Sequence, residues 1–223
     1  MQAVILAAGL GTRMGDLTKE TPKPLLKYQG KSFLEHNLLA LPDEVNEVII
    51  VVGYLQEHIR AAIGDVFSGK KITYLEQREK KGTGHALSLC KDAVHDRFLV
   101  LMGDDIYAAA DLKQMVQAPL AILAWEMRGD ETGTDRQAVI KINEIGELVD
   151  IIERRPANKG TLVNAGAYVL NANFFKYPLV PAGNQTDEFG LPQTMLQMVG
   201  DGVKFNIVKA TSWTKITSPE DLK

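Results

Sequence analysis

Two glycines, an arginine and a lysine near the start of the chain are spaced so that they could hold phosphate groups. Gly9 and Gly11 permit a sharp turn whose backbone N–H groups can face an anion. Arg13 adds a planar, forked cation that suits phosphate oxygens. Lys23 stands between two prolines that restrict the backbone, so this lysine has less conformational freedom to lose on binding. Together these residues predict a cradle for a phosphate chain.

A carboxylate that could bind a divalent cation follows a later apolar segment, residues 97–102. Gly103 and Asp104 come directly after this segment, at the end of an expected buried strand, and ligands of parallel sheets lie beyond such ends. Mg²⁺ favours carboxylate and phosphate oxygens and often takes only one or two protein ligands. Asp104 is therefore the candidate metal ligand, and Asp105 is expected to be a surface carboxylate that caps the next turn.

A third group of polar residues follows the strand expected at 71–75. Gln77 can donate and accept hydrogen bonds at once, which suits the edge of a nucleobase. Gly82 allows a close approach, and the Thr83 hydroxyl can either cap the helix that begins there or contact the base. A lone histidine within that helix, His85, is expected to have a structural role.

The elements that must position these residues alternate between strand and helix through the first half of the chain. Strands are expected at 3–8, 47–52, 71–75 and 97–102, and helices at 31–41, 55–63 and 83–91. This order predicts right-handed crossovers and a parallel sheet covered on both faces. Gly9, Gln77 and Asp104 then lie along one edge of the sheet, beyond the carboxyl ends of its strands.

The second half is richer in strands. They are expected at 120–127, 138–143, 148–152, 165–170 and 203–208, with helices at 171–175 and 188–199 and a short one capped by Ser218. No Pro/Ser-rich linker or low-complexity segment divides the chain, which favours a single domain over residues 1–223. The expected fold class is α/β, with a mixed, mostly parallel central sheet and helices on both faces.

Charge and cysteine content exclude several classes of protein. The 223 residues carry 25 basic and 28 acidic side chains, for a net charge of −3, which argues against a general nucleic-acid or membrane surface. Cys90 is the one cysteine, so no internal disulfide or thiolate metal cluster is expected, and the thiol is predicted to be buried and inert. The N-terminal apolar run is too short to span a bilayer and lacks a basic leader, which predicts a cytoplasmic protein.

The string L-A-A-G-x-G-T-R-M, followed by T-P-K-P-L-L, resembles the N-terminal motif of the sugar-1-phosphate nucleotidyltransferases, the nucleoside-diphosphate-sugar pyrophosphorylases. The resemblance implies a Rossmann-like domain whose first half, about 1–115, binds the nucleotide and whose second half, about 116–223, binds the acceptor. It implies nucleotide contacts from Ala8, Gly9, Gly11 and Thr12 and catalytic phosphate contacts from Arg13 and Lys23. Neither a P-loop nor the dinucleotide-binding fingerprint is present.

The string Q-x-x-x-x-G-T-G-H-A looks like the base-binding segment of the N-acetylglucosamine-1-phosphate uridylyltransferases. This likeness adds Gln77, Gly82 and Thr83 to the nucleotide-binding set and favours UTP among the triphosphates. In the same family a G-D pair after the corresponding strand supplies the ligand of the catalytic Mg²⁺, a role that falls on Asp104.

The chain departs from the family at the second metal ligand. The family's W-x-D string reads Trp213-Thr214-Lys215 here, so a lysine stands where the aspartate would complete the metal site. The K-I-T-x-P-E-D-L wording is similar to that of the methylerythritol-phosphate cytidylyltransferases, in which this lysine faces the reacting phosphates. Lys215 is therefore predicted to be a catalytic phosphate contact; weakened metal binding and an outward-facing lysine stay open.

The acceptor-binding residues implied by the resemblance are Glu153, Arg155 and Asn164. Glu153 and Asn164 would hydrogen-bond sugar hydroxyls and Arg155 would hold the acceptor phosphate, although the sequence cannot separate it from Arg154. A surface salt bridge between Glu153 and Arg155 is the alternative. The family's Y-G pair would fall near Gln137, where no glycine occurs, and this leaves the pose of the sugar open.

The implied reaction is Mg²⁺-dependent transfer of a nucleoside monophosphate from an NTP to a sugar 1-phosphate, giving an NDP-sugar and pyrophosphate. One alternative is a cytidylyltransferase for a non-sugar phosphate such as an alcohol or choline phosphate. Another, of a different class, is a non-catalytic nucleotide-binding regulatory protein. No nucleic-acid or membrane partner is expected, and a homo-oligomer is left open.

Overall fold

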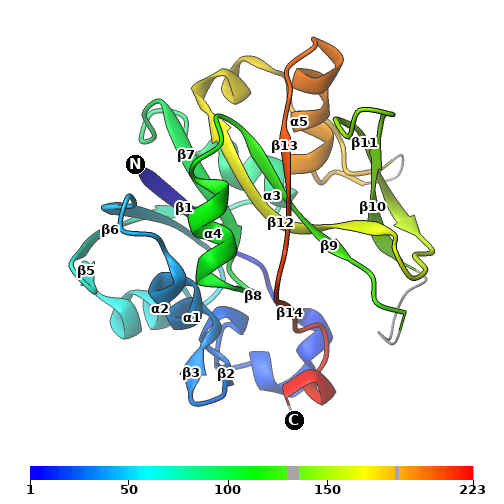
Figure 1. Ribbon diagram of the computed structural model, residues 1–223. Coiled ribbons are helices and arrows are strands. Elements are labelled where there is room, and N and C mark those ends of the chain that lie inside the picture. Colours follow the sequence, from blue (N-terminus) through cyan, green and yellow to red (C-terminus); the bar gives the residue numbers. More distant parts are fainter. Residues whose placement is uncertain (130–135, 184–185, 223) are drawn as a thin grey trace.

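The computed structural model describes residues 1–129, 136–183 and 186–222, and it shows an α/β protein built on a long mixed sheet (Figure 1). Its strands follow the order β11-β10-β12-β7-β1-β4-β6-β5. The central strands are parallel: β1 (Gln2–Ala7), β4 (Glu47–Val52), β6 (Lys70–Glu76) and β7 (Arg97–Met102). The predicted fold class, including the mostly parallel centre of the sheet, is confirmed.

The second half of the chain extends this sheet with antiparallel strands. β12 (Leu162–Asn171) pairs with β7 and with β9 (Ala121–Glu126), and β13 (Asn206–Lys209) runs parallel to β9. β10 (Gln137–Ile142) pairs with β11 (Leu148–Arg155) at the edge opposite β5 (Val66–Phe67), as Figure 1 shows.

Helices cover both faces of the sheet because its strands are apolar on both sides. Ala3 and Ile5 of β1 pack in one cluster with α1 (Phe33–Ala40), α2 (Gln56–Ile63) and α4 (Ala109–Met115). Val4 and Leu6, which point to the opposite face, pack in a second cluster with α3 (Gly82–Ser88) and α5 (Leu191–Gly200). The first strand is thus held rigidly from both sides, and the loop that follows it starts from a fixed point.

Short elements surround the carboxyl ends of the central strands. They are the 3-10 helices η1 (Thr12–Thr18), η2 (Lys23–Leu25) and η4 (Pro219–Leu222), and the strand pairs β2 (Lys27–Tyr28) with β3 (Lys31–Ser32) and β8 (Asp105–Tyr107) with β14 (Trp213–Lys215). A further 3-10 helix, η3 (Ala172–Lys176), lies at the opposite edge, beside the amino end of β7. The β8–β14 pair brings the C-terminal segment beside the end of β7. Helix α4 and strands β8 and β14 were not predicted from the sequence.

The sequence prediction is wrong at the start of α5. This helix was expected from Glu188 but begins at Leu191. The residues before it are used differently: Phe189 N donates to Lys81 O at 2.8 Å, and Gly84 N donates to Phe189 O at 2.8 Å. These two bonds fix the segment before α5 against the start of α3.

Two predictions from composition can be compared with the structure. Cys90 is fully buried, and burial raises the pKa of its thiol to about 12, in agreement with an inert thiol. In the described ranges, no helix combines the length and the apolar character that a membrane span requires. The cytoplasmic location stays a prediction.

Candidate active site

The glycine loop after β1 folds back onto Lys23. Gly11 adopts a positive φ of 66°, and its carbonyl oxygen accepts hydrogen bonds from Met14 N at 2.9 Å and Thr18 Oγ1 at 3.1 Å. A Cβ at position 11 would lie 2.8 Å from Lys23 Cβ. Glycine is therefore required here for two independent reasons, the left-handed backbone and the contact with the lysine.

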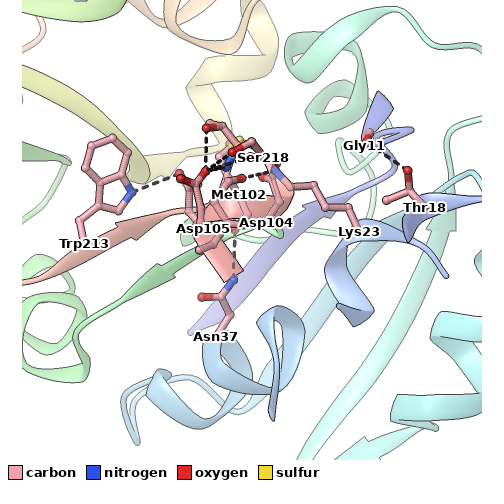
Figure 2. Close-up of polar contacts among 12 residues, drawn as sticks. Gly11, Thr18, Lys23, Asn37, Met102, Asp104, Asp105, Trp213 and Ser218 are labelled. Carbon is pink, nitrogen blue, oxygen red and sulfur yellow. Dashed lines mark hydrogen bonds and ion pairs between the residues drawn. The ribbon is translucent and has the colours of Figure 1, made fainter. Parts of the chain in front are cut away.

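Lys23 forms an ion pair with Asp104 (Figure 2). The Lys23 Nζ lies 2.6 Å from Asp104 Oδ2 and also donates to Ile216 O at 2.6 Å. The Lys23 side chain is only 11% exposed, whereas that of Asp104 is 43% exposed. The pair thus joins the loop after β1, the end of β7 and the C-terminal segment at one point, with the carboxylate still open to solvent.

A cavity of about 360 Å³, here termed the first cavity, opens between the glycine loop and the start of α3. It is lined by nine predicted site residues: Ala8, Gly9, Gly11, Thr12, Lys23, Gln77, Gly82, Thr83 and Asp104. The sequence therefore identified most of its polar lining. Lys80 and Glu188 also line it and were not predicted.

In the first cavity, Gln77 is held by α3. Its Nε2 donates to Gly82 O at 3.0 Å and lies 3.0 Å from His85 Nδ1. The interpretation of His85 as a residue with a structural hydrogen bond agrees with this contact. The sequence offered Thr83 as a possible cap of α3, but its side chain makes no cap hydrogen bond there. Its Oγ1 instead accepts a hydrogen bond from Leu191 N, at the start of α5, at 3.1 Å.

A larger cavity of about 800 Å³, the second cavity, adjoins the first on the side of the antiparallel strands. The two cavities share Gly11, Thr12, Lys23 and Asp104. The second cavity is also lined by four further predicted residues: Arg13, Glu153, Asn164 and Lys215. The structure therefore brings the predicted phosphate contacts and the predicted acceptor residues to one continuous opening.

Asp105 was expected at the surface, and this prediction is wrong. The residue is only 8% exposed, and its Oδ2 accepts from Trp213 Nε1 at 3.1 Å (Figure 2). Burial, followed by the neighbouring charge of Asp104, raises the pKa of this carboxyl to about 7, against the opposing effects of the Trp213 hydrogen bond and of the nearby lysines. The cause is the pairing of β8 with β14, which covers Asp105 with the C-terminal segment.

Lys215 reaches the second cavity from β14, where it is paired with Asp105. Its Nζ donates to Gln137 Oε1 at 3.5 Å and lies 5.5 Å from the centre of the Trp213 ring. Lys215 is thus an exposed residue that also lines the second cavity. Its ammonium lies on the same side of the sheet as the Lys23–Asp104 pair, where it can contact an anion in the second cavity.

The structure separates the two arginines that the sequence could not. Arg154 lines the second cavity together with Glu153, whereas Arg155 lines neither cavity. Strand alternation would place residues 153 and 155 on the same face. Arg154 has a φ of 55°, and the register of β10 and β11 shifts beside it, so the alternation fails here. Arg155 instead pairs with Gln137 in the ladder.

Asn164 lies in β12, and both the nitrogen and the oxygen of its side-chain amide make hydrogen bonds within the protein. Its Nδ2 donates to the Tyr168 hydroxyl at 2.7 Å, and its Oδ1 accepts from Gly166 N at 3.0 Å. An amide has two donor hydrogens and two acceptor lone pairs, so one of each is left for a ligand. The side chain is thus oriented before any ligand binds.

Sequence reasoning did not assign four polar residues of the second cavity. They are Asp105, Arg136, Arg154 and Thr217. They come from separate strands and loops with no shared motif, and only the pairing of strands brings them together. An arginine that follows a glutamate at the end of a strand, as in Glu153-Arg154, was the one available signal.

The chain belongs to the nucleotidyl transferase family, whose sequence profile matches residues 2–222. It is 34% identical over 99% of its length to a UTP–glucose-1-phosphate uridylyltransferase, AglF of Haloferax volcanii, and covers 93% of that protein. It is 30% identical to the bifunctional protein GlmU of Methanocaldococcus jannaschii, and it spans 52% of that longer relative. The resemblance to sugar-1-phosphate nucleotidyltransferases is confirmed.

The fold is also that of solved structures with low sequence identity. A putative glucose-1-phosphate thymidylyltransferase from Bacillus anthracis aligns with a TM-score of 0.84 at 21% identity, over 100% of this chain and 92% of the other. This likeness shows the Rossmann-like nucleotidyltransferase architecture that the sequence predicted.

Proposed function

We propose that this nucleotidyltransferase transfers a nucleoside monophosphate from an NTP, with UTP favoured, to a sugar 1-phosphate, and releases pyrophosphate. The observation that carries the proposal is the junction of the two cavities at Lys23 and Asp104. Such a junction suits a reaction in which two phosphate-bearing substrates meet. The similarity to a uridylyltransferase and the Gln77–Thr83 segment support UTP.

In this reaction an oxygen of the acceptor phosphate attacks the α-phosphorus in line and pyrophosphate leaves. The protein contributes mainly positioning and charge neutralisation. The glycine loop and Lys23 hold the triphosphate, while Arg13 and Lys215 face it from the second cavity. No general base is needed because the acceptor phosphate is already ionised near pH 7. Glu153 and Asn164 orient the sugar.

The residues present fit a divalent cation held in large part by substrate. Among the described residues, no group of three or more His, Cys, Asp and Glu side chains could enclose a metal ion. Asp104 nevertheless offers a partly exposed carboxylate at the junction, and Mg²⁺ commonly binds one or two carboxylates together with substrate phosphates and water. Bound there, Mg²⁺ would neutralise charge on the phosphates. Asp105 also lines the second cavity, but it is only 8% exposed and its Oδ2 already accepts a hydrogen bond from Trp213 Nε1.

A cytidylyltransferase for a non-sugar phosphate is the second candidate. Lys215 in the second cavity, where a carboxylate was expected, and the absence of a glycine near Gln137 favour it. A regulatory protein that binds nucleotide without turnover is the remaining alternative.

A panel assay of pyrophosphate release distinguishes these functions. UTP, dTTP, CTP, GTP and ATP are each combined with sugar 1-phosphates and with alcohol phosphates, with Mg²⁺ or with EDTA. Release from UTP and a sugar 1-phosphate that stops in EDTA is the expected result. Turnover confined to CTP and an alcohol phosphate would establish the second candidate. Tight triphosphate binding without any release would establish the regulatory one.

A further inference from the structure

Thr18 is a buried threonine at the end of η1, the 3-10 helix that follows the glycine loop. It is only 5% exposed and lines neither cavity. Its Oγ1 lies 3.1 Å from Gly11 O and 3.2 Å from Gly15 O, and Figure 2 shows the first of these contacts. A hydroxyl has one hydrogen to donate, so the two carbonyl oxygens share it in a three-centre bond. One buried side chain thus holds two peptides of this loop.

The two residues whose carbonyls accept from Thr18 are both glycines with a positive φ. Gly11 has a φ of 66° and a ψ of 29°, and Gly15 has a φ of 58° and a ψ of −129°. Glycine has more freedom about its backbone bonds than any other residue, so a glycine alone does not fix the direction of the peptide that follows it. The Thr18 hydroxyl therefore restrains the loop at two positions where the backbone itself restrains it least.

The Gly11 carbonyl determines where the N–H group of the same peptide unit points. The described residues contain no cis peptide bond, so the C=O of Gly11 and the N–H of Thr12 point in opposite directions. The carbonyl is turned towards Thr18 and towards Met14 N, at 2.9 Å. The Thr12 N–H points away from Thr18, and Gly11 and Thr12 line both cavities. No hydrogen bond from Thr12 N to another described residue uses this donor.

The Thr18 side chain has little freedom of its own. Threonine is branched at Cβ, which restricts its χ1 angle. A Cβ added to Gly11 would lie 3.1 Å from Thr18 Cγ2 and 2.8 Å from Lys23 Cβ, so the methyl group packs beside the loop and close to the lysine. The methyl group fills space and the hydroxyl holds the carbonyl, and substitution can separate these two roles.

We propose that Thr18 is a positioning residue for the triphosphate. Its hydroxyl holds the Gly11 carbonyl away from the cavities and thereby keeps the Thr12 N–H directed at a phosphate oxygen. This inference rests on the proposed function. A carbonyl oxygen turned towards the cavity would repel a phosphate, whereas the N–H donates to it. Met14 N restrains the carbonyl from within η1, and Thr18 restrains it from the far end of the same helix. Thr18 acts through the backbone and contacts neither substrate.

The test compares T18V with T18S. T18V replaces the hydroxyl by a methyl group of similar size, and T18S keeps the hydroxyl. The ligand is UTP, or whichever triphosphate of the panel the wild type binds most tightly. T18V is expected to raise the KM and Kd for this triphosphate about tenfold, the order expected from one hydrogen bond, and to change the KM for the acceptor less than about twofold. T18S is expected to retain most of the wild-type affinity because it keeps the donor.

T194V is the matched control for a general loss of stability. Thr194 is also fully buried, its Oγ1 donates to Gly190 O at 2.8 Å, and it lines neither cavity. T18V and T194V are both expected to lower Tm, which thermal melts measure, but only T18V should raise the KM for the triphosphate. If T18V does not fold, T18A is compared with T18S, because both lack the methyl group and differ only in the hydroxyl.

An unchanged KM and Kd for the triphosphate in folded T18V would overturn the inference. An equal effect in T18S or T194V, or an equal rise in the KM for the acceptor, would also overturn it. The Kd is measured by calorimetry without an acceptor. If no acceptor supports turnover but T18V, unlike T194V, still weakens triphosphate binding, the proposed function fails and the inference about Thr18 stands. A wild type that binds none of the triphosphates would overturn both.

Discussion

The two cavities are lined by different kinds of groups. The first is lined largely by the glycine loop, the end of β1 and the start of α3, where backbone and small side chains dominate. The second is lined by charged side chains from many segments, among them Arg13, Arg136, Arg154, Glu153 and Lys215. A ligand bound by backbone groups needs neighbouring residues whose types are restricted, such as the glycines of the loop. A ligand bound by charged side chains needs only that the fold bring those side chains together from different segments.

This difference defines experiments that affect one cavity or both. Lys23 lines both cavities, so its removal should impair the binding of both substrates. Gly82 belongs to the first cavity and Arg154 to the second, so their variants should raise the KM of only one substrate each.

The largest effect is expected from K23A, which removes the cation at the junction. The loss in kcat/KM should be on the order of 10²–10³, because a charged contact to the reacting phosphates is removed. K19A is a matched control: Lys19 also pairs with an aspartate, Asp16, at 2.7 Å, but on an exposed surface. Steady-state kinetics with both substrates measure the effect. A loss below about tenfold would contradict a catalytic role for Lys23.

A smaller effect, confined to the first cavity, is expected from G82A. Alanine is strained at a φ of 82°, and its Cβ would lie 2.5 Å from Phe189 O, so the start of α3 must shift. The KM for the triphosphate should rise about tenfold, with little change in the KM for the acceptor. G146A has the same φ of 82° but no atom within 4 Å of the new Cβ. If G146A raised the triphosphate KM as much, backbone strain alone would explain the result.

The second cavity is tested with the pair R154M and R155M. R154M should raise the KM for the acceptor about tenfold, because it removes a charged hydrogen-bond donor. R155M should change it less than about twofold, since Arg155 lines neither cavity. The reverse order of effects would show that Arg155, as the sequence resemblance implied, holds the acceptor.

The smallest effect concerns stability and comes from Asp105. Its pKa is raised from an ordinary 3.8 to about 7 in the folded protein. Between those values the folded state keeps a proton that the unfolded chain has lost, so the free energy of unfolding falls as the pH rises through this window. D105N should therefore raise Tm by at least about 2 °C at pH 8, with the gain disappearing towards pH 4. Thermal melts across this range measure it; a gain that is independent of pH would point to another cause.

The sequence predicted the central strands and the first cavity well because both depend on local pattern. Apolar runs define β1, β4 and β7, and the glycine loop follows directly from β1. It was wrong about Asp105 and the start of α5, because both are decided by contacts between distant segments. Arg154 could not be separated from Arg155 because the left-handed backbone at position 154 breaks the alternation of the strand.

The position of β10 and β11 at the border of the sheet bears on how this enzyme can diversify. These strands carry Glu153 and Arg154, yet they pair with the rest of the sheet through few positions and lie far from β1 and β4. The two side chains point into the second cavity and not into the buried clusters to which this hairpin contributes Val139, Ile140, Leu148 and Ile151. If Glu153 and Arg154 contact the acceptor as proposed, substitution at these two positions would change the acceptor and leave the residues shared by the two cavities as they are.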